Sequence, residues 1–493
     1  MSKKITFLDK TFWITESEAN PKHVGGLQLL ELPEDAADDY VDQLYADLKC
    51  FDQGVEPFNC TVDRVLGFPT KFIPLDRLDM DYHIKIHEID DVNNKTELNK
   101  FIATLHEVWL DRDKPLWQYH LIKDKSKKGF ASYVKVHHMY ADGTSLMRMF
   151  QEGFSDKPNT EDFIPVWAAD LKPRKVRPKG SIFEKRLKGI WEQIISIKDL
   201  VWILFRLLLK ILRINQTYMP IPFSGTKTIL TGQVTKGRAV STIEIDFARV
   251  SALSKRLRAS ANEIMLCVFD IGVHRFLRDH GQSFDKALYT NMPINLRKPG
   301  DTSGGNKIAI VPVELAHGRK DPYLRLRQII ENHRIIKRTT RLSEPGAFTY
   351  YTMLIQSFST LFEFLKISDW VKPIGNILIS NMPGPKKTLY FKDAKLISMC
   401  PLSTMTPGGG VNITMITYNN IAQIGIVCCN RDIKCLEPLA QYSLEAFDML
   451  EACVDDPALN IEDIGEVIDE HEYLHEHEHE LDIFMSNQRD IYR

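Results

Sequence analysis

Residues 135–143 read Lys-Val-His-His-Met-Tyr-Ala-Asp-Gly, and the interpretation of the whole chain starts from this stretch. Residues 129–136 are rich in β-branched and aromatic side chains and predict a strand, whereas a helical pattern resumes at 145–151. Two histidines therefore follow the end of a strand. An imidazole titrates near neutrality and can accept a proton from a hydroxyl group. On the residues alone, two hydrogen-bonded structural histidines explain the pattern about as well.

The segments on both sides of this motif alternate between strands and helices. Strands are expected at 116–123, 129–136, 240–245, 289–296, 307–315, 374–381, 411–418 and 422–428. Helices are expected at 38–49, 98–109, 190–214, within 247–278, at 323–338 and at 436–450. A single core stops growing at about 250–300 residues. A chain of 493 residues with this alternation is therefore predicted to form two α/β domains.

Changes in composition suggest where the domains begin and end. The motif lies in a first domain, 1–165, and a Pro- and Lys-rich linker with a crossover helix occupies 166–225. A second domain is expected at 226–454, followed by an acidic tail at 455–493. The tail is expected to be disordered, because strongly acidic low-complexity segments stay solvated. Its histidines leave a metal site as the less favoured alternative; they are His471, His475, His477 and His479.

The overall charge excludes some classes of partner. Lys and Arg number 63 against 65 Asp and Glu, so the chain has no global positive field to attract nucleic acid. The mean hydropathy of −0.22 excludes a multi-span membrane protein. Asp9 and Lys10 interrupt the first apolar stretch, so no signal peptide is expected. The expected location is the cytoplasm, with peripheral attachment to the inner membrane face or to lipid bodies.

That attachment is assigned to residues 190–214. Residues 172–213 hold twelve Lys or Arg and three acids, and the polar residues of 190–214 recur at helical spacing. Arg206 and Lys210 interrupt the apolar run, so the segment is too short in apolar residues to span a bilayer. A basic amphipathic helix in the plane of the lipid headgroups is favoured. A helix buried against the second domain is the alternative.

The pattern His-His-x-x-x-Asp-Gly is the signature of chloramphenicol-acetyltransferase-type enzymes and of peptide-synthetase condensation domains. From Phe7 to about Leu450, the chain most closely resembles the bacterial wax ester synthase/acyl-CoA:diacylglycerol acyltransferase family. The order and spacing of seven blocks carry this resemblance: Leu8-Asp9 with Pro21–Gly26 (Pro-Lys-His-Val-Gly-Gly), Pro115-Leu116-Trp117, His137–Gly143, Asn291–Arg297, Gly305-Asn306, Ile379–Pro385 and Gly410–Thr414. The family's Asn-Asp pair in the second half is Asn262-Glu263 here.

The resemblance implies a fold, a reaction and its substrates. The fold would be two chloramphenicol-acetyltransferase-like domains that form a pseudo-dimer, with an active-site tunnel between them. The reaction would move a long-chain acyl group from acyl-CoA to a fatty alcohol, giving a wax ester, or to diacylglycerol, giving triacylglycerol. Acyl-CoA is a substrate, so no cofactor and no metal are expected.

The same resemblance suggests roles for particular residues. His138 would be the general base of the catalytic block that ends at Gly143, and His137 would shape the loop. Asp142 would hold the loop through a charge-assisted pair with Arg297, although Arg297 could equally be a surface arginine. Asn412 and Thr414 are candidates to stabilise the oxyanion, or they are polar residues on the solvent face of a strand.

Two other functions remain as alternatives. A non-catalytic relative could use the basic helix to coat lipid droplets, but such a protein has no need of the intact motif. A condensation enzyme with an amine acceptor is ranked last, because no carrier domain is evident in the sequence.

Overall fold

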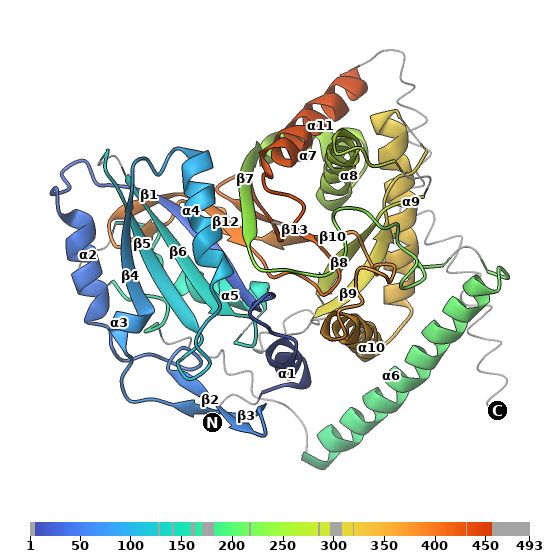
Figure 1. Cartoon of the computed structure of the whole chain (residues 1–493), viewed down its shortest axis with the longest axis horizontal. Helices are drawn as coiled ribbons and strands as arrows, with labels where there is room; N and C mark the ends of the chain where they lie inside the picture. The colour runs from blue at the N-terminus through green and yellow to red at the C-terminus, as the bar shows by residue number, and fades with distance from the viewer. Residues whose placement is uncertain are drawn as a thin grey trace.

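The computed structural model contains two six-stranded mixed sheets with helices packed on them (Figure 1). It describes residues 5–126, 129–140, 142–158, 163–169, 182–215, 218–283, 286–295, 308–318, 320–429 and 431–455. The α/β class expected from the sequence is confirmed. The domain boundaries expected at 165, 225 and 454 stay predictions. The two sheets cross them in part, since β11 and β12 come from the second half of the chain but belong to the first sheet.

The first sheet is built mainly from the first half of the chain. Its strand order is β11 (Tyr390–Phe391), β12 (Ala394–Leu402), β1 (His23–Glu31), β6 (Gly129–His137), β5 (Trp117–Asp124) and β4 (Ile84–Ile89). All neighbours are antiparallel except β4 and β5. The other elements of this half are α1 (Phe7–Ile14), α2 (Tyr40–Lys49), β2 (Cys60–Val65), β3 (Phe68–Pro74), α3 (Met80–His83), α4 (Lys95–Glu107) and α5 (Gly143–Glu152).

The second sheet comes entirely from the second half. Its order is β7 (Arg238–Asp246), β14 (Ile421–Cys429), β13 (Val411–Tyr418), β10 (Ile377–Pro383), β8 (Tyr289–Asn295) and β9 (Ile308–Glu314). Strand β10 runs parallel to both β13 and β8. The helices of this half are α7 (Phe247–Arg256), α8 (Ala261–Asp279), α9 (Pro322–Arg341), α10 (Pro345–Phe364) and α11 (Glu437–Asp455).

Strand β12 joins the two halves, and the sequence analysis did not predict it. Although β12 belongs to the second half, it pairs with β1 in the first sheet, where Figure 1 shows it in orange beside blue strands. The sheets approach closely at this point, since a side chain on Gly425 of β14 would lie 2.0 Å from the carbonyl oxygen of Pro401. Val427 of the second sheet packs in one cluster with Leu27 and Tyr133 of the first. The two halves therefore form one continuous body.

The long helix expected within 247–278 is two helices. Arg258 has a positive φ of 47°, which ends α7. Ser260 then starts α8 through a capping box with Glu263, whose carboxylate accepts a hydrogen bond from the Ser260 N–H at 2.7 Å. Glu263 is also held by His333, whose Nδ1 lies 2.8 Å from its Oε1. The departure from the family's Asn-Asp pair is thus accommodated inside a buried polar cluster.

Helix α6 (Ile182–Ile211) lies at the edge of the second half, against α10 (Figure 1). Three of its polar side chains, Asp199, Arg206 and Lys210, contact the protein, whereas Gln193 and Lys198 are exposed. Asp199 accepts a hydrogen bond from the N–H of Glu344 at 2.8 Å. The guanidinium of Arg206 lies 4.8 Å from the centre of the Tyr218 ring, and Lys210 donates to the carbonyl oxygen of Tyr218.

From residue 191 onward, where the side chains of α6 are described, its outward face is mainly apolar. Within the described side chains of α6, residues 191–211, the buried apolar ones are Ile203 and Leu207, which pack against α10. The large apolar side chains that remain exposed on α6 and its C-terminal extension are Trp191, Ile194, Ile197, Val201, Trp202, Leu204, Phe205, Leu208, Ile211, Leu212 and Ile214. The helix thus packs on the second half through Ile203, Leu207 and its polar contacts, which is close to the alternative expected for 190–214, although much of its apolar surface stays exposed. The expected attachment to a lipid surface stays a prediction.

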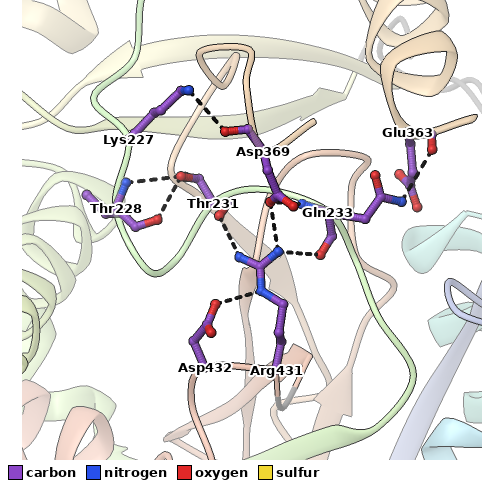
Figure 2. Close-up of polar contacts among 8 residues, drawn as sticks. All are labelled: Lys227, Thr228, Thr231, Gln233, Glu363, Asp369, Arg431 and Asp432. Carbon is purple, nitrogen blue, oxygen red and sulfur yellow. Dashed lines mark hydrogen bonds and ion pairs between the residues drawn. The ribbon is translucent and has the colours of Figure 1, made fainter. Parts of the chain in front are cut away.

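A polar cluster fastens the segment that follows α6 to the second half (Figure 2). Arg431 is at its centre and donates to the carboxylate of Asp369 at 2.8 Å and to the carbonyl oxygens of Gln233 and Thr231 at 3.1 and 3.3 Å. Gln233 in turn donates to the carbonyl oxygen of Glu363 at 3.3 Å. Because Thr231 also bridges Gly409, this cluster holds in place the loop that precedes β13.

Candidate active site

The motif residues form a fixed connection between β6 and α5. His137 is the last residue of β6, and the backbone N–H of His138 donates to the carbonyl oxygen of Lys22 at 2.8 Å. Tyr140 is fully buried; its hydroxyl donates to the carbonyl oxygen of Cys60 at 2.5 Å and accepts from the N–H of Leu116 at 2.8 Å. These contacts hold both histidines on a rigid frame, as a catalytic loop requires.

The two histidines face different surroundings. His137 is buried away from the cavity, and its Nε2 lies 3.3 Å from Oε1 of Glu16. Its Nδ1 accepts a hydrogen bond from the N–H of Met139 at 3.0 Å, so this imidazole is engaged with the protein. Glu16 also accepts from Nε of Arg112 at 3.0 Å and from the N–H of Lys22 at 3.1 Å. The sequence analysis did not identify Glu16, because no pattern marks a single buried carboxylate.

His138 lines the cavity between the two halves. Its ring stacks on Phe12 of α1, with ring centres 4.0 Å apart and planes inclined by 14°. Burial lowers the pKa of His138 below its usual range, while the negative charges of Asp142 and Asp9 act in the opposite direction. The imidazole is therefore neutral at neutral pH, and carboxylates nearby favour the imidazolium once it forms.

Asp142 and Gly143 connect this loop to the second half. Asp142 is the N-cap of α5, and its Oδ1 accepts from the N–H of Ser145 at 2.9 Å. A side chain on Gly143 would lie 2.4 Å from the sulfur of Met382 on β10, so any larger residue here would require the Met382 side chain to move. Arg297, the expected partner of Asp142, lies outside the described residues, as do Gly305 and Asn306, which form the fifth of the seven blocks.

Asn412 and Thr414 lie on β13 and reach the same cavity as His138. Both are buried, which excludes the solvent-facing alternative for these two residues. Thr414 donates its hydroxyl proton to Oδ1 of Asn412 at 2.7 Å, and Nδ2 of Asn412 donates to the carbonyl oxygen of Thr404 at 2.7 Å. Because an amide nitrogen carries two protons, Asn412 has a second N–H to offer, whereas the single proton of Thr414 is already used.

The cavity has a volume of about 290 Å³ and lies at the seam between the sheets. Elements of both halves line it, including α1, β1, α5, β10 and α10. Its wall is largely apolar and contains flexible methionine side chains, which adapt to ligands of different shape. Those methionines are Met147, Met353, Met382, Met399 and Met405. A single Lys or Arg, Lys22, is found among the described residues that line it.

Two further expectations concern metals and membranes. Within the part of the chain that the structure describes, no three His, Cys, Asp or Glu side chains are grouped so that they could hold a metal ion. The four histidines of the acidic tail lie outside that part. No helix among the described ranges is both long and apolar enough to cross a bilayer.

Comparison with solved structures identifies the fold. The first condensation domain of the calcium-dependent antibiotic synthetase matches with a TM-score of 0.59 at 14% identity, covering 94% of this chain and 99% of that domain. At this identity the likeness concerns the fold alone. It is the two-domain α/β fold shared with condensation domains, as expected, and the motif stands at the seam between its halves.

Sequence comparisons identify the family. The chain matches the wax ester synthase/diacylglycerol acyltransferase catalytic domain over residues 5–265 and the C-terminal domain of the same family over 304–451. The chain belongs to this acyltransferase family, which confirms the resemblance stated from its motifs.

Individual members of the family match along nearly their whole length. An O-acyltransferase of Acinetobacter baylyi is 26% identical, covering 91% of this chain and 96% of that protein. A probable diacylglycerol O-acyltransferase of Mycobacterium tuberculosis is also 26% identical, covering 90% and 98%. The solved wax ester synthase/diacylglycerol acyltransferase from Marinobacter aquaeolei has a TM-score of 0.71 at 25% identity, covering 92% of this chain and all of that one.

Proposed function

We propose that the chain transfers a long-chain acyl group from acyl-CoA to the hydroxyl of a fatty alcohol or a diacylglycerol, with His138 as the general base. The observation that carries this proposal is the position of His138, whose neutral imidazole lines an apolar cavity between the two halves. Two oily substrates fit such a cavity, because apolar contacts along their chains can position the reacting atoms.

The reaction follows from the properties of this histidine. His138 takes the proton of the acceptor hydroxyl as its oxygen attacks the thioester carbonyl. A C–O bond forms, the C–S bond breaks, and the CoA thiolate leaves, since the pKa of a thiol is about 8.5. The imidazolium then returns its proton to the thiolate. No covalent acyl-enzyme is formed, and the balance of atoms requires no metal or other cofactor.

The tetrahedral intermediate needs a donor for its oxyanion. Asn412 is the residue we assign to this role, through the second N–H of its amide. Thr414 acts as its positioning residue, because the Thr414 hydroxyl fixes Oδ1 of Asn412 and thereby directs Nδ2. Asp142 maintains the loop by capping α5.

One assay separates this function from its alternatives. Radiolabelled palmitoyl-CoA is offered with hexadecanol, a diacylglycerol or a primary amine, and the products are separated. We expect ester products with the alcohol and the diacylglycerol. Transfer only to the amine would identify a condensation-type enzyme, and no transfer at all would favour a lipid-surface protein without catalytic activity.

We also propose that the outer faces of α6 and α10 attach the protein to the cytoplasmic membrane face or to lipid bodies. The neighbouring helix α10 and the turn after it also carry exposed apolar residues, which are Leu354, Phe358, Leu361, Phe364, Leu365 and Trp370. Exposed apolar patches of this kind typically bind a partner or a membrane. Lys366 and Lys372 are exposed beside Phe364 and Trp370, which suits an anionic lipid surface.

Replacing Trp202, Phe205 and Leu208 together by Gln is expected to lower liposome binding at least about tenfold, since burial of each such side chain contributes about 1.5–3 kcal/mol. The change is read by co-sedimentation with vesicles that contain anionic lipid. Because the exposed face is apolar, binding by the unchanged protein should persist in high salt. Activity toward a short soluble alcohol should also persist.

The matched control makes the same substitutions at exposed apolar residues of the β2–β3 hairpin, which are Val65, Leu66 and Phe68. These are expected to leave liposome binding unchanged. Equal loss from both triple variants, or no loss from the α6 variant, would contradict the assignment of α6.

A further inference from the structure

Lys22 occupies an unusual position beside the candidate base. It precedes β1, its N–H donates to Glu16 at 3.1 Å, and its carbonyl oxygen accepts the N–H of His138 at 2.8 Å. The backbone of Lys22 is thereby fixed next to His138. Its side chain, which is only 2% exposed, extends along the wall of the active-site cavity.

The ammonium group of Lys22 has more protons than the protein uses. Nζ donates to the carbonyl oxygen of Met405 at 2.9 Å, and Met405 belongs to the same loop as Thr404, which binds the amide of Asn412. An ammonium has three N–H donors, whereas the structure provides this one hydrogen-bond acceptor among its described residues. A buried charge that is left partly unsatisfied is costly unless a ligand completes its hydrogen bonds.

We propose that Lys22 is a specificity-determining residue, which donates hydrogen bonds to the ester carbonyl oxygens of a diacylglycerol and so favours this acceptor over a simple fatty alcohol. The proposal rests on the proposed function, because it concerns the acceptor of the same reaction. In this proposal, Lys22 binds the ester carbonyl oxygens of the acceptor while His138 binds its hydroxyl.

The physical basis is the number of oxygen atoms that each acceptor brings. A fatty alcohol has one oxygen, and that oxygen must approach His138. A diacylglycerol carries two ester carbonyls close to its free hydroxyl, so its carbonyl oxygens can accept from Nζ while its hydroxyl meets the base. Sites built to hydrogen-bond a polar group discriminate strongly against substrates that lack it, because the buried donor is then unpaired.

The test compares kcat/KM for a diacylglycerol and for hexadecanol, with palmitoyl-CoA, in the unchanged protein and in Lys22→Met. Methionine retains much of the length of lysine without the charge. We expect the ratio of diacylglycerol to alcohol to fall at least about tenfold. An unchanged ratio would overturn the proposal and leave Lys22 as a tether of the loop at Met405. If the unchanged protein acylates neither acceptor, the proposed function itself fails, which is a separate outcome.

Lys135→Met is the matched control. Lys135 is the other deeply buried lysine of the first sheet, but its Nζ donates to the carbonyl oxygens of Leu105 and Val108 at 3.1 and 2.7 Å, away from the cavity. The same substitution there should leave the acceptor ratio unchanged. If the ratio fell as much in Lys135→Met as in Lys22→Met, the effect would come from a general loss of structural stability, and the proposal would be overturned.

A second measurement needs no variant. Burial lowers the pKa of Lys22 to about 8, against the opposing charges of Glu363 on α10 and Glu16 after α1, while Arg238 on β7 lowers it further. Lys22 therefore loses its charge as the pH rises from about 7 to about 9. Since His138 serves both acceptors, its titration cancels in the ratio. Because a neutral amine donates weaker hydrogen bonds than an ammonium, we expect the preference for diacylglycerol to decline over this range.

Discussion

Replacing His138 by Ala is expected to lower kcat for acyl transfer by about a hundredfold to ten-thousandfold, which is what a positioned general base contributes. Acyl-CoA should still bind, because the imidazole is assigned to the acceptor hydroxyl and not to the acyl chain. Initial rates at saturating palmitoyl-CoA measure the loss. In the unchanged protein, burial lowers the pKa of His138, so kcat/KM should fall only below the pH at which an ordinary histidine becomes protonated.

His137→Ala is the control for this assignment. His137 contacts Glu16 and the N–H of Met139, so its loss should displace the loop and cost less activity than the loss of His138. Both variants should be compared at equal folded concentration. The assignment of the base is wrong if His137→Ala is inactive while His138→Ala keeps the turnover of the unchanged protein.

The position of the motif could be predicted from the sequence because it depends on local patterns. The β-rich run before His137 and the Asp-Gly turn at 142–143 define a strand, a loop and a helix, and the structure has β6 and α5 there. Strand β12 could not be predicted in the same way. A strand's partner depends on long-range packing, and nothing local in 394–402 indicates that it pairs with β1.

For helix α6, the sequence predicted the element but not its orientation. The spacing of its polar residues correctly indicates two faces, but periodicity does not say which face turns toward the protein. That choice depends on partners far away in the sequence, here the backbone N–H of Glu344 and the ring and carbonyl oxygen of Tyr218. These partners satisfy Asp199, Arg206 and Lys210, and the apolar side is left outward.

The candidate site was predicted in part. The structure brings His138, Asp142, Asn412 and Thr414 to one cavity, and their individual roles stay predictions. Glu16 was missed because a single buried carboxylate has no sequence pattern of its own, and Lys22 was noted only as part of the block Pro21–Gly26, without a role. Their importance becomes visible only when the fold places Glu16 against His137 and Lys22 along the cavity.

Replacing Glu16 by Ala is expected to lower the free energy of unfolding by about 1–3 kcal/mol, which is typical when buried donors lose their acceptor. The carboxylate is 1% exposed, and its loss leaves Nε of Arg112 and the N–H of Lys22 without their acceptor. Activity should fall as well, because these contacts support the backbone that holds His138. Denaturant unfolding at neutral pH measures the change, and Glu16→Gln, which keeps an acceptor oxygen, should be milder.

The effect of pH on the stability of Glu16→Gln, compared with the unchanged protein, tests whether the charge of Glu16 stabilises the fold. Burial alone would raise the pKa of Glu16, but the charge and hydrogen bond of His137, the N–H of Lys22 and the charge of Arg112 outweigh it and lower the pKa to about 2. The pKa of Glu16 is about 4.5 in the unfolded chain and about 2 in the folded protein, so its ionised form stabilises the fold by about 3 kcal/mol above pH 4.5. This contribution is lost as the pH falls from about 4.5 toward about 2. The difference in free energy of unfolding between the unchanged protein and Glu16→Gln should therefore be largest at neutral pH. It should decrease as the pH falls below about 4.5. A difference that stays constant down to about pH 3 would mean that the charge of Glu16 does not stabilise the fold, and that packing alone explains its position beneath the catalytic loop.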